Sequence, residues 1–449
     1  MPKIALRTAA LAMALATSPA CGLLDTDQPN IIDPGTLDSP AGAAALRDGA
    51  LADFAFAKDG DGEQTEDGLI LVGGLMTDEF FFSTTPPSEQ EIDQRTPSPD
   101  NSSVSDPYSN LHKARAGAEN AAQALQQLTL DADSIPDVAE MLAVAGFTYI
   151  YFAETYCSGV PFGRTSGDSL IFGTPQTTAE MFDTALARFD SALAHPGLAG
   201  DDGTITGLAQ VGRGRALLGL GRFADAALAV AAVPTEFVYE TEHADSPVRL
   251  QNAVWSYSDG GLWSVADLEG DVGLPYRTAA DSRVPVDSLI DEDTGEVLPG
   301  LDLFTPQYFL LKYGSDSPIP VADGIEARLF EAEALVQVNN RPGMTAILND
   351  LRDLQGLDPV GVPGNQGAAV DLLFSERAFW LFATGHRLGD MRRLIRPAPQ
   401  GYGRPADSVF PIGSYHKGGS YGSDVNLPIP IEEENNPNSR GVGCLDRNP

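Results

Sequence analysis

The stretch that decides the fold is residues 371–395, DLLFSERAFWLFATGHRLGDMRRLI. Its first half repeats apolar residues at helical spacing, with polar residues such as Ser375 and Glu376 between them, which is typical of an amphipathic helix. Gly385 can adopt the left-handed conformation that ends a helix, and a second helical segment follows it. A helix, a glycine turn and a second helix form an αα-hairpin, which cannot bury both of its faces alone. The stretch therefore predicts a scaffold of neighbouring helix pairs.

Helical periodicity recurs in most of the chain. It predicts further helices over 41–56, 69–76, 108–128, 137–156, 178–194, 208–218, 224–233, 325–338 and 343–354. Gly221, Phe223 and Ala226 match the G-x-[YF]-x-x-A core of a tetratricopeptide repeat, where small residues let two helices approach closely. The predicted fold class is therefore all-α for the most part, with a tetratricopeptide-like helix-turn-helix scaffold.

Two regions interrupt this scaffold. Residues 236–320 lose the helical period and are punctuated by Gly, Pro, Asp and Ser, and residues 83–107 have a similar composition. Long loops on a rigid scaffold are often functional. The sequence therefore predicts a ligand-binding region over about 236–320, with a contribution from 83–107.

The composition excludes one class of partner. The chain has 449 residues, of which 43% are hydrophobic, and its 63 acidic and 28 basic residues give a formal net charge of -35. A surface this acidic repels phosphate backbones, so the sequence predicts no nucleic-acid partner. Neutral ligands and cations remain compatible with the charge.

The N-terminus has the features of an export signal. Lys3 and Arg7 precede an apolar run over 9–16, and small residues lead to Cys21. This pattern predicts a signal peptide over 1–20, a lipidated Cys21 and an extended tether to about residue 40. A lipid on Cys21 would anchor the protein to a membrane without spanning it. Ordinary signal cleavage, without lipidation, is the alternative.

Cys157 and Cys444 are the other cysteines of the chain. In an oxidising exterior they can pair as one disulfide. The alternative is two separate buried thiols.

Residues 371–395 also contain an ordered motif, Glu376-Arg377, then Gly385-His386-Arg387, then Asp390-Met391-Arg392-Arg393. This order resembles the "ER…EGHR…DLRR" block of SusD/RagB-like proteins, although Thr384 stands where that family often has Glu. These are surface lipoproteins that capture nutrients, usually glycans, for a TonB-dependent outer-membrane transporter. We expect the charges of the block to form pairs on helix surfaces without a ligand role.

Further segments extend the resemblance over nearly the whole chain. They are the aromatic run over 148–156 with Gly159-Val160-Pro161, the Asp281–Pro285 segment, and two segments near the C-terminus, 426–430 and 435–438. The resemblance implies one SusD-like domain over 41–449, with helical repeats at about 108–234 and 322–396 and a C-terminal tail over 397–449. It also implies a lipid-anchored protein on the surface of the outer membrane, with a SusC-like TonB-dependent transporter as its partner.

The sequence contains no catalytic constellation. Its five histidines lack metal-ligand spacing, and no nucleophile elbow, P-loop or Rossmann glycine pattern is present. The turn over 58–63 superficially resembles a calcium loop, but Gln64 occupies the position that requires Gly, so a solvent-exposed turn is predicted. We therefore expect no enzyme activity, no catalytic residue, no metal and no cofactor.

Aromatic side chains in the loop-rich region are the candidates for ligand binding. Sugars present apolar C–H faces, which aromatic rings flanked by polar groups bind well. The candidates are Trp255, Tyr257, Trp263 and Tyr276, and weaker candidates are Phe80, Phe81, Phe82 and Tyr108. The alternative is that these rings plug the loop region onto the helices.

The sequence thus predicts a binding protein for an oligosaccharide or another nutrient. The rival hypothesis is a helical-repeat scaffold of the cell envelope that has no small-molecule ligand.

Overall fold

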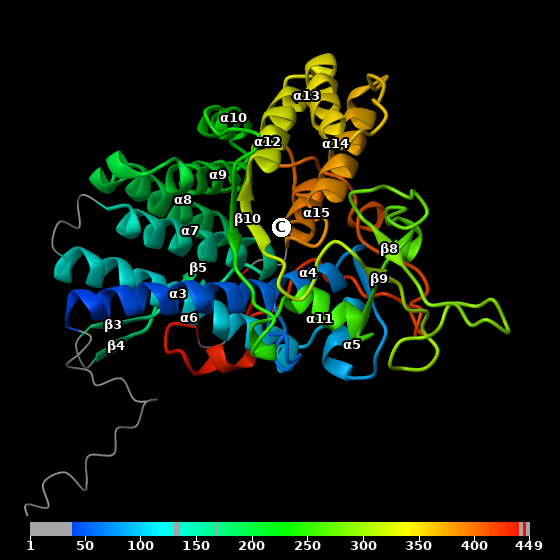
Figure 1. Ribbon diagram of the computed structural model, residues 1–449, viewed down its shortest axis with the longest axis horizontal. Helices are drawn as coiled ribbons and strands as arrows, with labels where there is room; N and C mark the ends of the chain where they lie inside the picture. Colours follow the sequence, from blue (N-terminus) through cyan, green and yellow to red (C-terminus); the bar gives the residue numbers. More distant parts are fainter. Residues whose placement is uncertain (1–37, 130–134, 167–168, 440–442, 446–449) are drawn as a thin grey trace, which may run out of the picture.

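The computed structural model describes residues 38–129, 135–166, 169–439 and 443–445. The predicted signal peptide, Cys21 and most of the predicted tether lie outside these residues. The fold is mostly α-helical, as the sequence predicts, and the helices stack side by side largely in chain order (Figure 1). In the order of the chain they are α3 (Pro40–Asp59), α4 (Leu69–Leu75), α5 (Pro87–Asp93), α6 (Ser102–Leu128), α7 (Asp137–Thr155), α8 (Thr178–Leu193), α9 (Thr204–Gly219), α10 (Phe223–Val230), α11 (Ala253–Asp259), α12 (Gly324–Gln337), α13 (Arg341–Leu354), α14 (Gln366–Trp380) and α15 (Arg387–Ile395).

Helix α9 shows why consecutive helices approach so closely. A Cβ atom at Gly212 would lie 2.2 Å from the Phe189 ring of α8, so only glycine leaves room for that ring. At the end of α9, Gly221 has a φ of +72°, a conformation that glycine adopts without steric cost. Phe223 and Ala226 of α10 then pack into the core against α9. The tetratricopeptide-like pair that the sequence predicts is present.

The strands are short and form two-stranded antiparallel sheets. They connect segments that are far apart in the sequence, as in β1 (Phe80–Phe82) with β7 (Trp263–Val265) and β6 (Val238–Thr241) with β10 (Ile319–Asp323). The other pairs are β2 (Val160–Pro161) with β5 (Pro175–Gln176), β3 (Arg164–Ser166) with β4 (Ser169–Ile171), and β8 (Val286–Asp287) with β9 (Phe309–Leu310).

The charged block of residues 371–395 is buried, which corrects the expectation of surface pairs. Arg377 of α14 contacts Asp390 of α15 through two hydrogen bonds, and Arg393 contacts the same carboxylate at 2.7 Å. Arg393 also contacts Glu333 of α12, which is fully buried. Buried charges must be paired, so the block fixes how the hairpin packs on its neighbouring helix.

The same network ties the hairpin to the loop-rich region. Glu376 accepts hydrogen bonds from Arg283 at 2.7 Å and from Arg352 of α13 at 2.6 Å. Arg387 at the start of α15 forms a bidentate contact with Asp78, which precedes β1, at 2.6 and 2.9 Å. The motif residues are therefore structural cross-links between segments that are distant in the sequence.

The two predicted loop regions are more ordered than expected. Residues 83–107 contain α5 and the beginning of α6, and Arg95 between them is buried beneath C-terminal residues, with its Nε donating to the Asp424 carbonyl at 2.9 Å. The stretch over 58–63 also differs from the predicted solvent-exposed turn, because only Glu63 in it is exposed. Lys58 and Asp59 are buried and joined at 2.7 Å, and burial lowers the pKa of Lys58. Tertiary packing decides both cases.

The C-terminal tail returns to the end of α7. The N–H of Leu427 donates to the Thr155 carbonyl, and the N–H of Cys157 donates to the Leu427 carbonyl, both at 2.9 Å. Cys157 and Cys444 form a disulfide with their Cα atoms 5.6 Å apart. Of the two alternatives left open by the sequence, the structure has the bridge.

Candidate ligand-binding site

Helix α11 separates two of the predicted ligand-binding aromatics. The sequence places Trp255 and Tyr257 in a loop, but Asn252 caps a helix here, with its Oδ1 accepting the N–H of Trp255 at 2.9 Å. Residues two positions apart in a helix face different directions. Tyr257 therefore turns inward, where its hydroxyl donates to Asp67 at 3.2 Å, and Trp255 remains half-buried at the surface.

Trp263 and Tyr276 are also core residues. The ring of Trp263 is 1% exposed and stacks on Phe80 with the ring centroids 3.8 Å apart. Tyr276 is fully buried between Phe379 and Phe382, at centroid distances of 5.2 and 4.7 Å. For Tyr257, Trp263 and Tyr276 the structure corresponds to the alternative in which the rings plug the loop region onto the helices.

The weaker candidates are also buried in the core. Phe80 and Phe82 belong to β1 and are buried against the core, Phe81 is 7% exposed, and Tyr108 of α6 is 4% exposed. These rings cannot stack on a ligand in this conformation. The many aromatic residues in these segments belong to the core, because burying a large apolar side chain removes its surface from water and stabilises the fold.

Trp255 lines an open hollow of about 470 Å³ at the surface. Three segments form it: the turn after α3, the residues around η3 (Val248–Leu250), and α11. The residues that line it are Gly62, Glu63, Gln64, Val248, Gln251, Trp255, Ser256, Asp259 and Gly260. Trp255 and Asp259 are four positions apart, so they share the face of α11 that lines the hollow.

Hydrogen bonds hold the floor of the hollow in place. The side-chain amide of Gln64 donates to the Ser256 carbonyl at 2.7 Å, and the Ser256 hydroxyl donates to the Gly62 carbonyl at 2.8 Å. Gln251 donates to the Asp245 carbonyl at 2.9 Å. Because these contacts join the turn to α11, the lining of the hollow is preorganised.

The hollow combines one aromatic ring with acidic and amide groups. Glu63 and Asp259 are exposed on its rim, and no Lys or Arg is among the lining residues named above. Carboxylates and amides accept and donate hydrogen bonds to hydroxyl groups. The arrangement suits a neutral polyhydroxyl ligand better than an anionic one.

The sequence pointed to Trp255 but missed its neighbours. Glu63 and Gln64 appeared only as a turn without a function, because nothing in the local sequence shows that the turn contacts α11, almost 200 residues away. Gln251 was equally unmarked. A glutamine or glutamate has no local signature for binding, so no signal in the sequence could have identified these residues.

Two kinds of feature are absent from the described part of the chain. No helix there is long and apolar enough to cross a membrane. Within the same residues, no group of three or more His, Cys, Asp or Glu side chains is placed to hold a metal ion.

Comparison with known proteins identifies the fold. At the level of sequence, no family model and no curated protein matches this chain. Among solved structures, a SusD superfamily protein from Parabacteroides distasonis is similar at 16% identity and a TM-score of 0.66, over 89% of this chain and 98% of that one. A laminarin-binding SusD-like protein has a TM-score of 0.65, with the same identity and the same coverage.

A third similar structure is surface glycan-binding protein A from Bacteroides uniformis. It is 12% identical, with a TM-score of 0.62 over 88% of this chain and 97% of that one. The chain therefore has the SusD-like fold, as the resemblance in its sequence predicts.

Proposed function

Because the chain has the SusD-like fold, we propose that it is a cell-surface protein that binds an oligosaccharide without cleaving it. The observation that carries this proposal is the hollow around Trp255, where a half-buried indole lies among Gln64, Gln251 and Asp259. The names of two proteins with similar structures, one laminarin-binding and one glycan-binding, support a glycan as the ligand.

The chemistry of the hollow favours a neutral sugar. The indole ring offers an apolar face to sugar C–H groups, while the surrounding amides and carboxylates bind hydroxyl groups. The acidic rim and the net charge of -35 repel uronic acids and sulfated sugars. Because the hollow is open, a chain end or an internal unit of a polysaccharide can enter it.

We further propose that Cys21 is lipidated and that the ligand passes to a SusC-like TonB-dependent transporter. The support is the export signal before Cys21 and the resemblance to SusD/RagB-like proteins. Labelling of cells with a fatty-acid probe, in the native chain and in Cys21→Ala, tests the anchor. Transporter capture on the native chain tests the partner.

The experiment for the ligand is a glycan-binding screen on the protein that begins after the signal peptide. With any glycan that binds, Trp255→Ala should weaken affinity about tenfold, roughly 1.4 kcal/mol. Trp255→Phe should retain most of the affinity, because it keeps an aromatic face. Leu228→Ala is the matched control, since Leu228 is an exposed apolar side chain on α10. Full affinity in Trp255→Ala would move the site elsewhere.

A second candidate, an envelope scaffold without a small-molecule ligand, is favoured by exposed apolar side chains near β8 and β9. Leu303 is 80% exposed and Phe304 is 71% exposed, and exposed apolar patches commonly mark protein contacts. If no glycan binds and cross-linked protein partners are lost in the double variant Leu303→Ser, Phe304→Ser, this second function replaces the first.

A further inference from the structure

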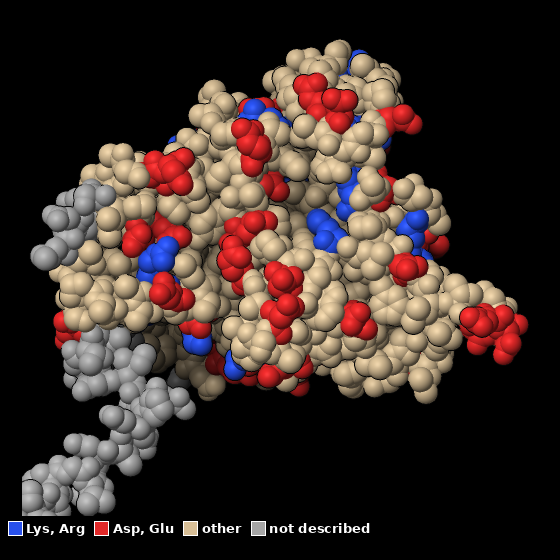
Figure 2. All heavy atoms as spheres, viewed as in Figure 1, with Lys and Arg blue, Asp and Glu red and all other residues tan. Residues whose placement is uncertain are grey.

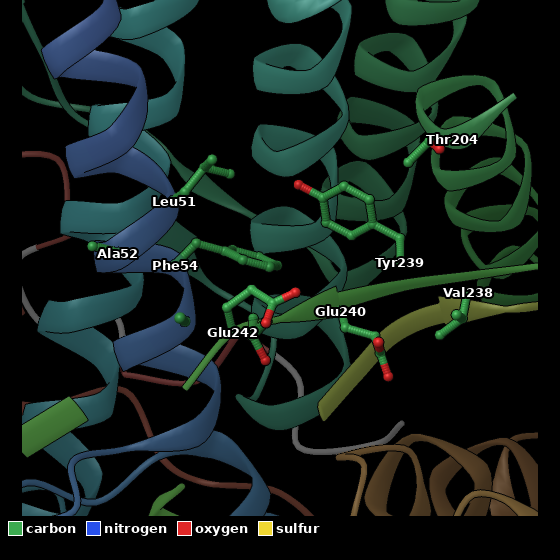
Figure 3. A pocket seen from close by; sticks show the side chains of 10 residues that line it. Leu51, Ala52, Phe54, Thr204, Val238, Tyr239, Glu240 and Glu242 are labelled. Carbon is green, nitrogen blue, oxygen red and sulfur yellow. The ribbon is translucent and has the colours of Figure 1, made fainter. Parts of the chain in front are cut away.

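A second cavity lies between α3 and β6, and it shares no lining residue with the hollow around Trp255 (Figure 3). Its volume is about 490 Å³, within the usual range for ligand pockets. One wall comes from α3 and the other from β6, with Thr204 of α9 at one end. The lining residues are Leu51, Ala52, Phe54, Ala55, Thr204 and the β6 segment 238–242.

The edge of β6 that faces this cavity is an open strand edge. Among the described strands, β6 pairs only with β10. The Phe237 carbonyl accepts the N–H of Gly324, so the backbone groups of Phe237 point toward β10. Glu240 lies opposite Pro320, which has no N–H to donate to it. Backbone groups of a strand alternate between its two edges. The N–H and C=O groups of Val238 and Glu240 therefore point away from β10, toward the cavity.

The wall opposite this edge is apolar and fixed. Leu51, Phe54 and Ala55 of α3 line it, and the Phe54 ring stacks on Tyr151 at a centroid distance of 5.9 Å. On the β6 side, Tyr239 points along the cavity (Figure 3) and its hydroxyl donates to Glu140 at 2.9 Å. The cavity thus pairs a row of free backbone groups with an apolar surface.

The remaining groups on the wall are acidic. Glu240 is half-buried and Glu242 is exposed, and both line the cavity. Burial raises the pKa of Glu240, and the nearby carboxylates of Glu242 and Asp323 raise it further. The nearby ammonium of Lys58 is already paired with Asp59 at 2.7 Å. Asp and Glu side chains gather on the surface over β6 (Figure 2), so a cation in the cavity would relieve this repulsion.

We propose that this cavity binds an extended peptide segment that contains Lys or Arg, and that the segment adds to the open edge of β6 as a third strand. Strand addition uses the free N–H and C=O groups for affinity and pockets for alternate side chains for specificity. In this cavity, apolar side chains would pack on α3, and basic side chains would pair with Glu240 and Glu242. None of the residues that line this cavity lines the hollow around Trp255.

The test uses synthetic pentapeptides and calorimetry on the intact protein. Acetyl-VKVKV-amide should bind at least about tenfold more tightly than acetyl-VEVEV-amide, a difference of roughly 1.4 kcal/mol. Backbone N-methylation on alternate residues provides the sharper comparison. Only one edge of an added strand contacts β6, so one of the two alternating methylation patterns should abolish binding while the other is tolerated.

Protein variants then locate the site. Glu240→Gln combined with Glu242→Gln should remove the preference for VKVKV, and Ala55→Trp should block the cavity against all peptides. The melting temperature of each variant checks folding, and the methylated peptides need no variant at all. Trp255→Ala should bind VKVKV normally, which separates this proposal from sugar binding. Equal loss with both methylation patterns, equal affinity for VKVKV and VEVEV, or no binding would overturn the proposal.

Discussion

Arg377 of α14 and Asp390 of α15 form a buried bidentate ion pair, with Nε–Oδ2 and Nη2–Oδ1 distances of 2.7 and 2.8 Å. Arg393 donates a further hydrogen bond to Oδ1 of the same carboxylate at 2.7 Å. Asp390 thus pairs with two guanidinium groups, while Glu333 supplies a second carboxylate to Arg393, and the Arg377–Asp390 contact joins the two helices of the αα-hairpin. The pair explains how these charged side chains can be buried, because each of them has a partner of opposite charge.

Removing this carboxylate should destabilise the protein strongly. Asp390→Asn leaves Arg377 and Arg393 with an uncompensated buried charge, and breaking such a pair costs about 3–5 kcal/mol. Urea unfolding monitored by circular dichroism measures the loss. The control is Asp225→Asn, which breaks the exposed Arg222–Asp225 pair and should cost less than about 1 kcal/mol. Similar losses in the two variants would contradict the role assigned to Asp390.

Glu79 should make stability fall as the pH rises above about 5. Burial raises the pKa of Glu79 to about 8, even though it accepts the N–H of Ala383 and lies near Arg387. In the unfolded chain a glutamate ionises near pH 4.3. Between these two values the native state binds one proton more than the unfolded state, so stability falls by about 1.4 kcal/mol per pH unit.

The variant Glu79→Gln should remove this contribution, because glutamine keeps the acceptor for Ala383 but does not ionise. Unfolding free energies at pH 5, 6, 7 and 8 compare the two slopes. The expected result is a shallower slope for Glu79→Gln over this interval. If the slopes are parallel, Glu79 is ionised in the folded protein at neutral pH.

The Cys157–Cys444 disulfide should be a major source of stability. It joins residues 287 positions apart, and removal of a native disulfide typically costs about 2–5 kcal/mol. Cys444→Ser and reduction of the native chain should lower the melting temperature by the same amount, and reduction of Cys444→Ser should have no further effect. Cleavage of the C-terminal segment by a protease should also become faster.

The two tryptophans near α11 should behave oppositely on substitution. Trp263→Ala removes a buried ring that stacks on Phe80, and such a change typically costs about 3–5 kcal/mol. Trp255 is half-buried at the surface, so Trp255→Ala should cost markedly less stability and act mainly on ligand affinity. A thermal scan with a glycan titration separates the two effects. Equal stability losses would contradict the assignment of Trp263 to the core.

Much of the fold was readable from local sequence. Apolar residues at helical spacing predicted the helix pairs, because a helix must bury one face wherever it packs. Gly221 and Gly385 marked turns, and both have positive φ in the structure. The order of short motifs along the chain pointed to the SusD-like fold, which the comparison of structures confirms. These features depend on neighbours within a few residues or on the order of segments.

The tertiary structure decided which side chains are buried. The charges of residues 371–395 looked like surface pairs, yet Glu333, Asp78 and Arg283, all distant in sequence, surround them. Trp255 and Tyr257 looked equivalent in the sequence, but α11 places Trp255 at the surface and Tyr257 in the interior. Nor did any pattern mark the open edge of β6. Burial, pairing and exposure depend on contacts between distant segments, and local periodicity contains no information about those contacts.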